Sequence, residues 1–232
     1  MNRIGIIGAM DEEVDILVEL MDIKETIEKA SLKFYKGTLE GKDIVLVRCG
    51  IGKVNSALCA QILISEFDVD AIVNTGVAGA LHSELDVLDM VISTDAIQYD
   101  VDTTAFGDPK GTIPRMESSV FVADEKLINA AYESSIKEMK SNKVLKGRVA
   151  TGDIFISSKE LKEELVNDFN AYCGEMEGGA IAHVCTLNKV PFVILRTISD
   201  KADDSATMDY PAFEKLAIAN NVKVMKELVA NI

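Results

Sequence analysis

Three acidic residues occupy positions where an α/β enzyme could use them for catalysis. Asp200 follows the apolar run Pro191–Ile198, Glu177 follows another apolar segment, and Glu13 comes shortly after the apolar run Ile4–Met10. Ligands of α/β sheets bind beyond the carboxyl ends of the strands, so we expect the three side chains to meet in one site. Carboxyl groups at such a site could protonate a leaving group, accept a proton from water or bind hydroxyl groups.

The local sequence around each acid favours a different role. Asp200 is expected at the end of a buried strand, where desolvation raises a carboxyl pKa toward the range that a general acid needs. Glu177 is expected at the start of a helix, from which its carboxylate could accept hydrogen bonds from sugar hydroxyls. Glu177, Glu12 and Glu13 could instead be charges that the helix macrodipole favours, and the residues alone leave this alternative open.

A glycine-rich segment invites comparison with nucleotide-binding loops. Gly50-Ile51-Gly52 is followed by Asn55 where the dinucleotide fingerprint has its third glycine. Val54 stands where a Walker loop has Ser or Thr. We therefore interpret the glycines as a tight turn between a strand and a helix.

Alternating strands and helices must position these groups. The expected strands are apolar on both faces and the helices are amphipathic, which indicates a mixed or parallel sheet covered on both sides. No linker or repeat interrupts the alternation, so residues 1–232 are expected to form a single domain. The expected strands are Ile4–Ile7, Ile44–Val47, Asp70–Asn74, Val87–Thr94, Val144–Ala150, Tyr172–Met176 and Pro191–Ile198. The expected helices are Asp11–Met21, Val54–Phe67, Asp124–Met139, Ser158–Phe169, Gly178–Leu187 and Tyr210 to the C-terminus.

The segment from Ala96 to Glu117 is the exception to the short connections of the chain. It has loop character over about twenty residues, and a loop of that length in a compact domain is usually functional or lies at an interface. Phe106 lies within it and has no evident place in the core of its own chain. We therefore expect this loop to contact a second subunit.

The charge balance restricts the class of ligand. The net charge is −14 and the isoelectric point is near 4.6, so the surface repels nucleic acid and anionic lipid. No stretch approaches the roughly 18 apolar residues of a membrane span, and the apolar start of the chain ends in three acids, which argues against a signal peptide. The four cysteines form no CxxC pair and are expected as buried free thiols. We expect a cytoplasmic protein that binds neither nucleic acid nor membrane.

These observations indicate an α/β enzyme with several carboxylates around a small, neutral, polar ligand. A further set of segments, in one order along the chain, carries a family resemblance: Gly5–Met10 with Glu12-Glu13, Cys49–Val54, Asn74-Thr75-Gly76, Thr104–Gly107, Gly152-Asp153 with Phe155-Ile156, Glu175-Met176-Glu177, Ala182–Cys185, and Arg196 through Ser199-Asp200. Through them the chain resembles the 5'-methylthioadenosine/S-adenosylhomocysteine nucleosidases. The resemblance implies the nucleoside phosphorylase-like α/β fold, a three-layer α/β/α sandwich with a central mixed sheet, and a homodimer.

The resemblance also implies roles for particular residues. Asp200, oriented by Ser199, would protonate the five-membered ring of the purine, and Glu13 would activate the attacking water. Glu177 would bind the ribose hydroxyls. Met176 would contact the ribose, Gly79 would contact ribose and base, and Phe155 and the backbone of Ile156 would bind the adenine. The 5' substituent would lie against Met10, Ile51 and Tyr210. Phe106 would reach the same substituent from the partner subunit.

The implied reaction is hydrolysis of the N-glycosidic bond of 5'-methylthioadenosine and S-adenosylhomocysteine, and of 5'-deoxyadenosine as well. The first two yield adenine and a 5-thio-substituted ribose, as methionine salvage and the recycling of S-adenosylmethionine by-products require. Carboxylates can stabilise the cationic sugar that forms, so no metal or redox cofactor is expected. Four departures from the family pattern, Thr103, Tyr210, Val77 and Gly178-Gly179, leave the three acids untouched, but the first two leave the preference among 5' substituents open.

Three alternatives remain open at this point. A purine nucleoside phosphorylase of the same fold would have to bind phosphate, but Asp11, Glu12 and Glu13 crowd the first loop. Like charges 4 Å apart repel by about 4 kcal/mol at an effective dielectric constant near 20, which argues against phosphate. A 6-amino-6-deoxyfutalosine hydrolase would use the same site for a larger nucleoside. A non-catalytic nucleoside-binding protein would not need all three carboxylates.

Overall fold

The apolar runs of the sequence form the strands of one ten-stranded mixed sheet in the computed structural model, which describes residues 1–232. The strands are β1 (Arg3–Gly8), β2 (Asp22–Lys29), β3 (Leu32–Leu39), β4 (Lys42–Arg48), β5 (Ala71–Ala80), β6 (Met90–Gln98), β7 (Phe121–Val122), β8 (Val144–Thr151), β9 (Ala171–Glu175) and β10 (Phe192–Asp200). Their order in the sheet is β10-β6-β8-β9-β5-β1-β4-β3-β2, and β7 pairs with β6.

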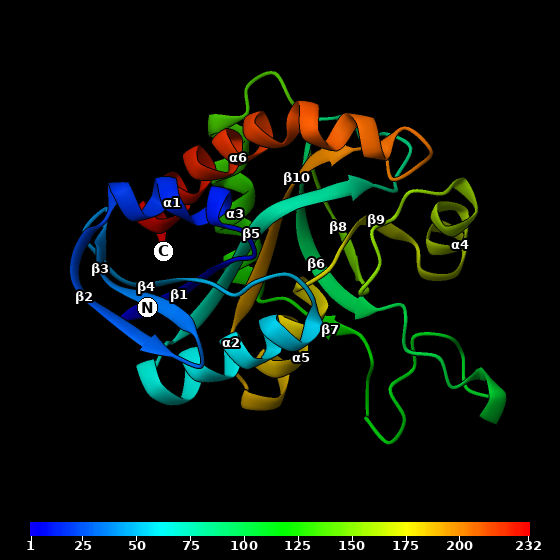
Figure 1. Ribbon diagram of the computed structural model, residues 1–232, viewed down its shortest axis with the longest axis horizontal. Coiled ribbons are helices and arrows are strands. Elements are labelled where there is room, and N and C mark those ends of the chain that lie inside the picture. The colour runs from blue at the N-terminus through cyan, green and yellow to red at the C-terminus, as the bar shows by residue number, and fades with distance from the viewer.

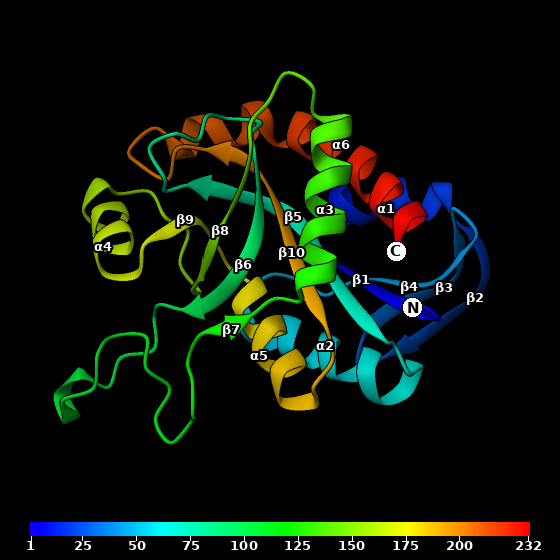
Figure 2. The same cartoon turned by 180° about the vertical axis from the view of Figure 1, so that it is seen from behind.

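Helices cover the two faces of this sheet (Figure 1). On one face lie α1 (Asp11–Leu20), α3 (Glu125–Glu138) and α6 (Ala206–Asn231), and on the other lie α2 (Lys53–Phe67) and α5 (Gly178–Asn188). The short helix α4 (Lys159–Phe169) lies beside β8 and β9, as the view from behind in Figure 2 also shows. Apolar side chains pack between sheet and helices on both faces. The three-layer α/β/α architecture is therefore confirmed.

The centre of the sheet is more curved than a flat sandwich. β10 pairs in parallel with β5 and in antiparallel with β6, so β5, β9, β8, β6 and β10 form a closed circuit of paired strands. β9 crosses the end of β5, where Gly79 pairs with Gly174. The closure brings the ends of strands that are distant in the sequence to one place.

Two features of the strands differ from the sequence-based expectation. The hairpin of β2 and β3 was not predicted, because β2 is exposed along almost its whole length and only Ile27 in it is partly buried. The expected end of the strand Asp70–Asn74 is wrong, since β5 continues through Thr75–Gly79 to Ala80 and stays paired with β10. Because Gly76 has no side chain, the side chain of Arg196 can lie against the backbone of β5 at this point.

Other findings bear on the general character of the chain. The four cysteines are free and buried, as expected. None of the helices combines the length and the apolar character that crossing a membrane requires. The long loop after β6 contains only one short 3₁₀ turn, η1 (Thr104–Phe106), and Figure 1 shows that it extends away from the sheet.

Candidate active site

A cavity of about 400 Å³, lined by 15 residues, opens where the strand ends meet. Its walls come from the ends of β1, β9 and β10, from β5, from α6 and from the segments that follow β4 and β8. Of the residues predicted for the site, those that line this cavity are Met10, Glu13, Ile51, Gly79, Phe155, Met176, Glu177, Ser199, Asp200 and Tyr210. The fold thus gathers residues from both ends of the chain around one volume.

The two other predicted residues lie elsewhere. Ile156 is buried and lines a small pocket that adjoins the cavity and shares Gly79, Phe155 and Asp200 with it. Phe106 lies on η1 and does not reach the cavity of its own chain, and its side chain is 89% exposed. The placement of Ile156 fits a contact with one end of a bound ligand, whereas Phe106 has no such contact within one chain.

Asp200 is the last residue of β10 and is buried. Its Oδ2 accepts a hydrogen bond of 2.8 Å from Ser199 Oγ, and its Oδ1 accepts one of 2.8 Å from the N–H of Ala202. Burial raises the pKa of Asp200, although these two hydrogen bonds oppose the rise. A carboxyl group in this environment is suited to hold a proton and to donate it to a ligand in the cavity.

Glu13 is buried although it belongs to the first turn of α1. Its Oε2 accepts hydrogen bonds from the N–H groups of Ala9 and Met10 at 2.6 and 3.1 Å, and its Oε1 accepts one from Val77 at 3.2 Å. Burial raises the pKa of Glu13, and the charge of Arg196 partly offsets this. The side chain therefore caps a helix and also faces the cavity, so the two interpretations of this residue are compatible.

Glu177 precedes α5 and also lines the cavity. Its Oε1 accepts a hydrogen bond of 2.9 Å from the N–H of Gly52, and its Oε2 lies 3.8 Å from Nη2 of Arg196. Burial, followed by repulsion from the neighbouring Glu175, raises the pKa of Glu177 to about 7. Glu177 is thus an acid whose charge state changes near neutral pH.

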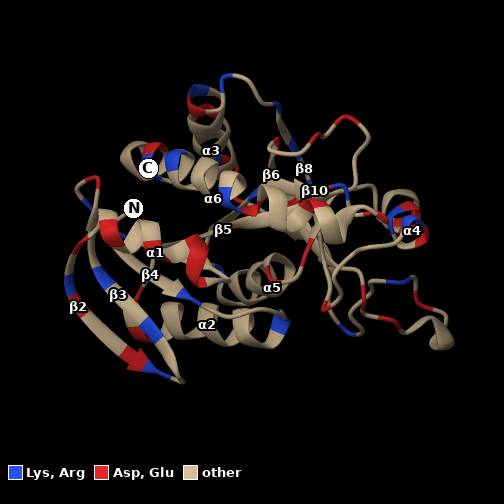
Figure 3. Cartoon of the chain, turned by 45° about the horizontal axis from the view of Figure 1, so that its top comes forward, with Lys and Arg blue, Asp and Glu red and all other residues tan.

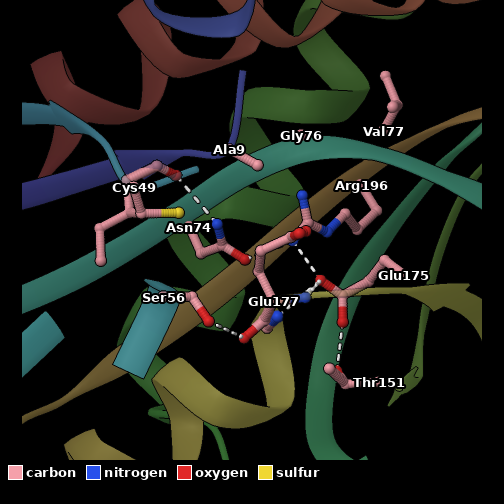
Figure 4. A network of polar contacts seen from close by, with 12 residues as sticks. Ala9, Cys49, Ser56, Asn74, Gly76, Val77, Thr151, Glu175, Glu177 and Arg196 are labelled. Atoms are coloured by element: carbon pink, nitrogen blue, oxygen red, sulfur yellow. Dashed lines mark hydrogen bonds and ion pairs between the residues drawn. The ribbon is translucent and has the colours of Figure 1, made fainter. Parts of the chain in front are cut away.

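A buried polar network fixes this wall of the cavity (Figure 4). The side chain of Arg196 is 1% exposed, and its Nη2 donates to Oδ1 of Asn74 at 2.6 Å and forms an ion pair with Glu175. Glu175 also accepts hydrogen bonds from Thr151 Oγ1 and from the N–H of Glu177, the latter at 3.0 Å. The network connects β5, β8, β9 and β10 and determines where the Glu177 backbone begins its helix.

The roles of Glu175, Arg196 and Asn74 were not predicted from the sequence. A signal was present, because Arg196 interrupts the apolar strand Phe192–Asp200. A charge in a buried strand needs a partner, which here is Glu175, 21 residues away. That partner depends on strand order, which the sequence pattern does not give.

The Met10 end of the cavity is apolar. Tyr210 lies against Met10, with its hydroxyl 3.3 Å from the thioether sulfur, and donates a hydrogen bond of 2.7 Å to Glu214. The rings of Phe155 and Tyr210 meet edge to face at 5.9 Å between centroids. Ile51 completes this wall. Aromatic and thioether groups of this kind suit an apolar substituent of a ligand.

No lysine, arginine or histidine lines the cavity, although Glu13, Glu175, Glu177 and Asp200 do. Arg48, the basic residue that ends β4, pairs with Asp11 at 2.8 Å on the outside. Figure 3 shows acidic residues spread over helices, strands and loops, in keeping with the net charge of −14. The site therefore favours a neutral ligand, or one that becomes cationic, over a phosphate anion.

Comparisons with known proteins agree with this geometry. The family model described as the phosphorylase superfamily matches residues 3–230. A 5'-methylthioadenosine/S-adenosylhomocysteine nucleosidase of Halalkalibacterium halodurans is 43% identical over 233 residues, which cover 100% of both chains. The structure of the enzyme of that name from Neisseria meningitidis, in complex with methylthio-immucillin-A, matches with a TM-score of 0.95 and 37% identity over 100% of both chains. A futalosine hydrolase of Helicobacter pylori matches with a TM-score of 0.93 and 37% identity over 100% of this chain and 98% of that one.

Proposed function

Because the chain belongs to the phosphorylase superfamily and, within it, to the 5'-methylthioadenosine/S-adenosylhomocysteine nucleosidases, we propose that it hydrolyses the N-glycosidic bond of both nucleosides through Asp200, Glu177 and Glu13. The products are adenine and a 5-thio-substituted ribose. The observation that carries the proposal is one cavity in which carboxylates from three elements converge without a lining cation.

The reaction separates charge along the bond that breaks. The sugar becomes cationic and the departing purine becomes anionic. Asp200 donates its proton to the five-membered ring of the purine, which neutralises the leaving group. Ser199 and the N–H of Ala202 then stabilise the carboxylate that remains.

The other two acids act on the sugar. Glu177 binds the ribose hydroxyls in its ionised form, and its negative charge stabilises the cationic sugar. Glu13 accepts a proton from the water that attacks the anomeric carbon. Three backbone N–H groups hold Glu13 in place, so its carboxylate is oriented before the substrate binds.

The remaining lining residues bind the rest of the substrate. Phe155 and the backbone of Ile156 bind the adenine, while Met176 and Gly79 contact the ribose. The apolar wall accepts the 5' substituent; it consists of Met10, Ile51 and Tyr210. The same site would accept 5'-deoxyadenosine. The role of the enzyme in the cell is methionine salvage.

A second substrate is a 6-amino-6-deoxyfutalosine-type nucleoside. The observation that favours it is the likeness to the Helicobacter pylori futalosine hydrolase, which has the same 37% identity as the Neisseria meningitidis nucleosidase. The cavity opens to solvent beside Ile51, whose side chain is 55% exposed, so a longer 5' substituent could extend outward.

We also propose that residues 1–232 form one catalytic domain that works as a cytoplasmic homodimer. Exposed apolar side chains lie on α2, α5, β7 and η1, which Figures 1 and 2 show on the same side of the molecule. These side chains are Val54, Leu58, Leu187, Val122 and Phe106. Their burial by a second copy would remove apolar surface from water, and Phe106 would then complete the neighbouring cavity.

The test is an assay of purified protein with each nucleoside in phosphate-free buffer. We expect free adenine from methylthioadenosine and from adenosylhomocysteine, and the ratio of their kcat/KM values to that of aminofutalosine decides the preferred substrate. Absence of adenine from both thionucleosides would contradict the proposal.

A further inference from the structure

The catalytic acid is held by the peptide unit that follows it. The N–H of Ala202 donates to Oδ1 of Asp200 at 2.8 Å. Ala202 is fully buried and has φ of 51°, in the left-handed region that non-glycine residues seldom adopt. The orientation of the bond between Lys201 and Ala202 therefore determines whether this hydrogen bond forms.

The other end of the same peptide unit is bound by a lysine from a different element. Lys162 of α4 is partly buried, and its Nζ donates to the carbonyl oxygen of Lys201. In a trans peptide the C=O and N–H groups point in opposite directions, so Lys162 and Asp200 bind the two ends of one dipole. An ammonium group at the carbonyl polarises the peptide and strengthens donation by its N–H group.

Apolar packing and polar contacts both hold this loop, because Ala202 belongs to the buried apolar cluster that also includes Leu165 and Phe169 of α4. In Figures 1 and 2, α4 lies beside the segment that joins β10 to α6. The groove between them has a volume of about 610 Å³, and Val166 is the one hydrophobic residue among the eight that line it. The side chain of Lys201 anchors the loop on its far side, through hydrogen bonds of 2.7 Å to Leu85 O and Asp86 Oδ1. Polar contacts thus fix the Lys201 end of the peptide unit, whereas Ala202 at its other end packs in the apolar cluster.

We propose that Lys162 is a positioning residue for the catalytic acid, which orients and polarises the Lys201–Ala202 peptide so that it donates to Asp200. The inference rests on the proposed role of Asp200 as the acid. By favouring the carboxylate that forms after proton transfer, Lys162 makes Asp200 a stronger acid. Lys162 acts through the peptide and does not contact the cavity, whose lining residues do not include it.

The sign of the pH effect follows from the charges around Asp200. Removing the Lys162 charge raises the pKa of Asp200, so activity persists to higher pH on the basic limb, where the acid loses its proton. The charged groups around Asp200 are Asp203 on its loop, Asp209 on α6, Lys162 on α4, and Glu13, Glu175 and Glu177, which line the same cavity. The side chain of Lys201 is directed away, to Asp86.

The test compares Lys162→Met with Lys162→Arg and with Lys159→Met as the matched control. Lys159 is on the same helix and lines the same groove, but its Nζ pairs only with Glu163 at 3.7 Å. For Lys162→Met we expect kcat to fall about tenfold, as for the loss of one charge-assisted hydrogen bond, with KM within about twofold and the basic limb of kcat/KM at higher pH. Lys162→Arg restores both, and Lys159→Met matches the wild type.

A double mutant separates this role from a general effect on folding. In the Asp200→Asn background, Lys162→Met should have no further effect on kcat, because the group on which it acts is gone. If Lys162→Met fails to fold, Lys162→Gln removes the charge and should give the same shift of the basic limb. A folded Lys162 variant with wild-type kcat and an unmoved limb overturns the inference. An active Asp200→Asn would overturn the proposed function instead.

Discussion

In the proposed reaction Asp200 and Glu177 need opposite charge states, although burial raises the pKa of both. Asp200 must hold a proton before the bond breaks, whereas Glu177 must be ionised to stabilise the cationic sugar. The neighbours of each carboxyl group favour the charge state that it needs. Glu177 accepts the N–H of Gly52 and lies near Arg196, while Asp200 faces Asp203 and Asp209, whose charges disfavour its ionisation. The pH dependence of kcat/KM should therefore have an acidic limb from Glu177 and a basic limb from Asp200.

The acidic limb can be moved by changing a neighbour of Glu177. Burial and then Glu175 raise the pKa of Glu177 to about 7, so activity should increase as pH rises through about 7. Glu175→Gln removes the like charge and lowers the pKa of Glu177, and the acidic limb should move to lower pH. The measurement is a kcat/KM profile of both proteins. An unmoved limb would show that another group controls it.

The acid itself is tested by Asp200→Asn, which keeps the shape of the side chain and removes its proton. Loss of general acid catalysis typically lowers the rate by about 100- to 10,000-fold, and we expect kcat to fall within this range. Asp204→Asn is the matched control, because Asp204 lies in the same loop and is exposed. A folded Asp200→Asn enzyme that keeps more than about a tenth of wild-type kcat would exclude Asp200 as the acid.

That the three acids proposed to react lie in one cavity could be predicted from sequence, but the residues that hold them could not. Asp200, Glu177 and Glu13 follow apolar runs, so a general rule about strand ends brings them together. The contact of Arg196 with Asn74 joins positions 122 residues apart, and it arises because β10 lies beside β5. No local pattern specifies that neighbour.

At the scale of elements, β5 has a part in the site that its sequence did not reveal. The strand was expected to end at Asn74, but it continues through Gly76, which lets Arg196 and Glu13 approach the backbone. A Cβ atom on Gly76 would lie 1.9 Å from Nη1 of Arg196 and 2.8 Å from Oε1 of Glu13. β5 continues through Gly76 because strand pairing uses backbone groups, which glycine also has. The absence of a side chain at Gly76 leaves room for Arg196 and Glu13.

Gly76→Ala should therefore affect activity more than fold. Displacing Arg196 and Glu13 should lower kcat at least about tenfold, and overpacking of this kind costs about 1–3 kcal/mol of stability. Gly147→Ala is the comparison, because its Cβ would collide with Tyr172 at 2.1 Å, away from the cavity. Thermal unfolding should report a loss in both variants. Equal kcat values for the two folded proteins would contradict this account of Gly76.

Sequence periodicity predicted the buried elements and not the exposed hairpin. The helices α1, α2, α3, α4 and α5 lie within one residue of the expected bounds at each end, since amphipathic segments between apolar strands leave little freedom. β2 is exposed along almost its whole length and pairs with β3, while Ile27 packs at the edge of the core and Lys29 pairs with Glu66 of α2. A strand such as β2, which is paired but mostly exposed, cannot be predicted from the periodicity of buried apolar residues.

At the scale of the whole molecule, the acidic surface opposes association of two copies, whereas the exposed apolar side chains favour it. The net charge of −14 keeps like molecules apart at long range, so a stable dimer needs a local apolar contact to overcome repulsion. Val54, Leu187 and Val122 supply exposed apolar surface on the side that also carries Phe106. A second copy would cover these side chains and bring Phe106 to its cavity.

Light scattering at assay concentrations should accordingly give the mass of a dimer. Phe106→Ala should raise KM for methylthioadenosine, because the 5' substituent loses an aromatic contact, and should leave the mass unchanged. Ile136→Ala is a control for loss of an exposed apolar side chain, since α3 lies on the opposite face. A fully active monomer would rule out a cavity shared between subunits.

The central claim, hydrolysis rather than phosphorolysis, is tested most directly by identifying the sugar product with and without phosphate. Glu13 faces the cavity where water must attack, and no cation lines the cavity to hold phosphate. Mass spectrometry of the methylthioadenosine reaction should show free methylthioribose at a rate independent of phosphate. Glu13→Gln should lower that rate about 100-fold or more, with KM largely kept, whereas Glu12→Gln on the exposed side should not. Methylthioribose 1-phosphate as the main product, at a rate that saturates with phosphate, would contradict the account.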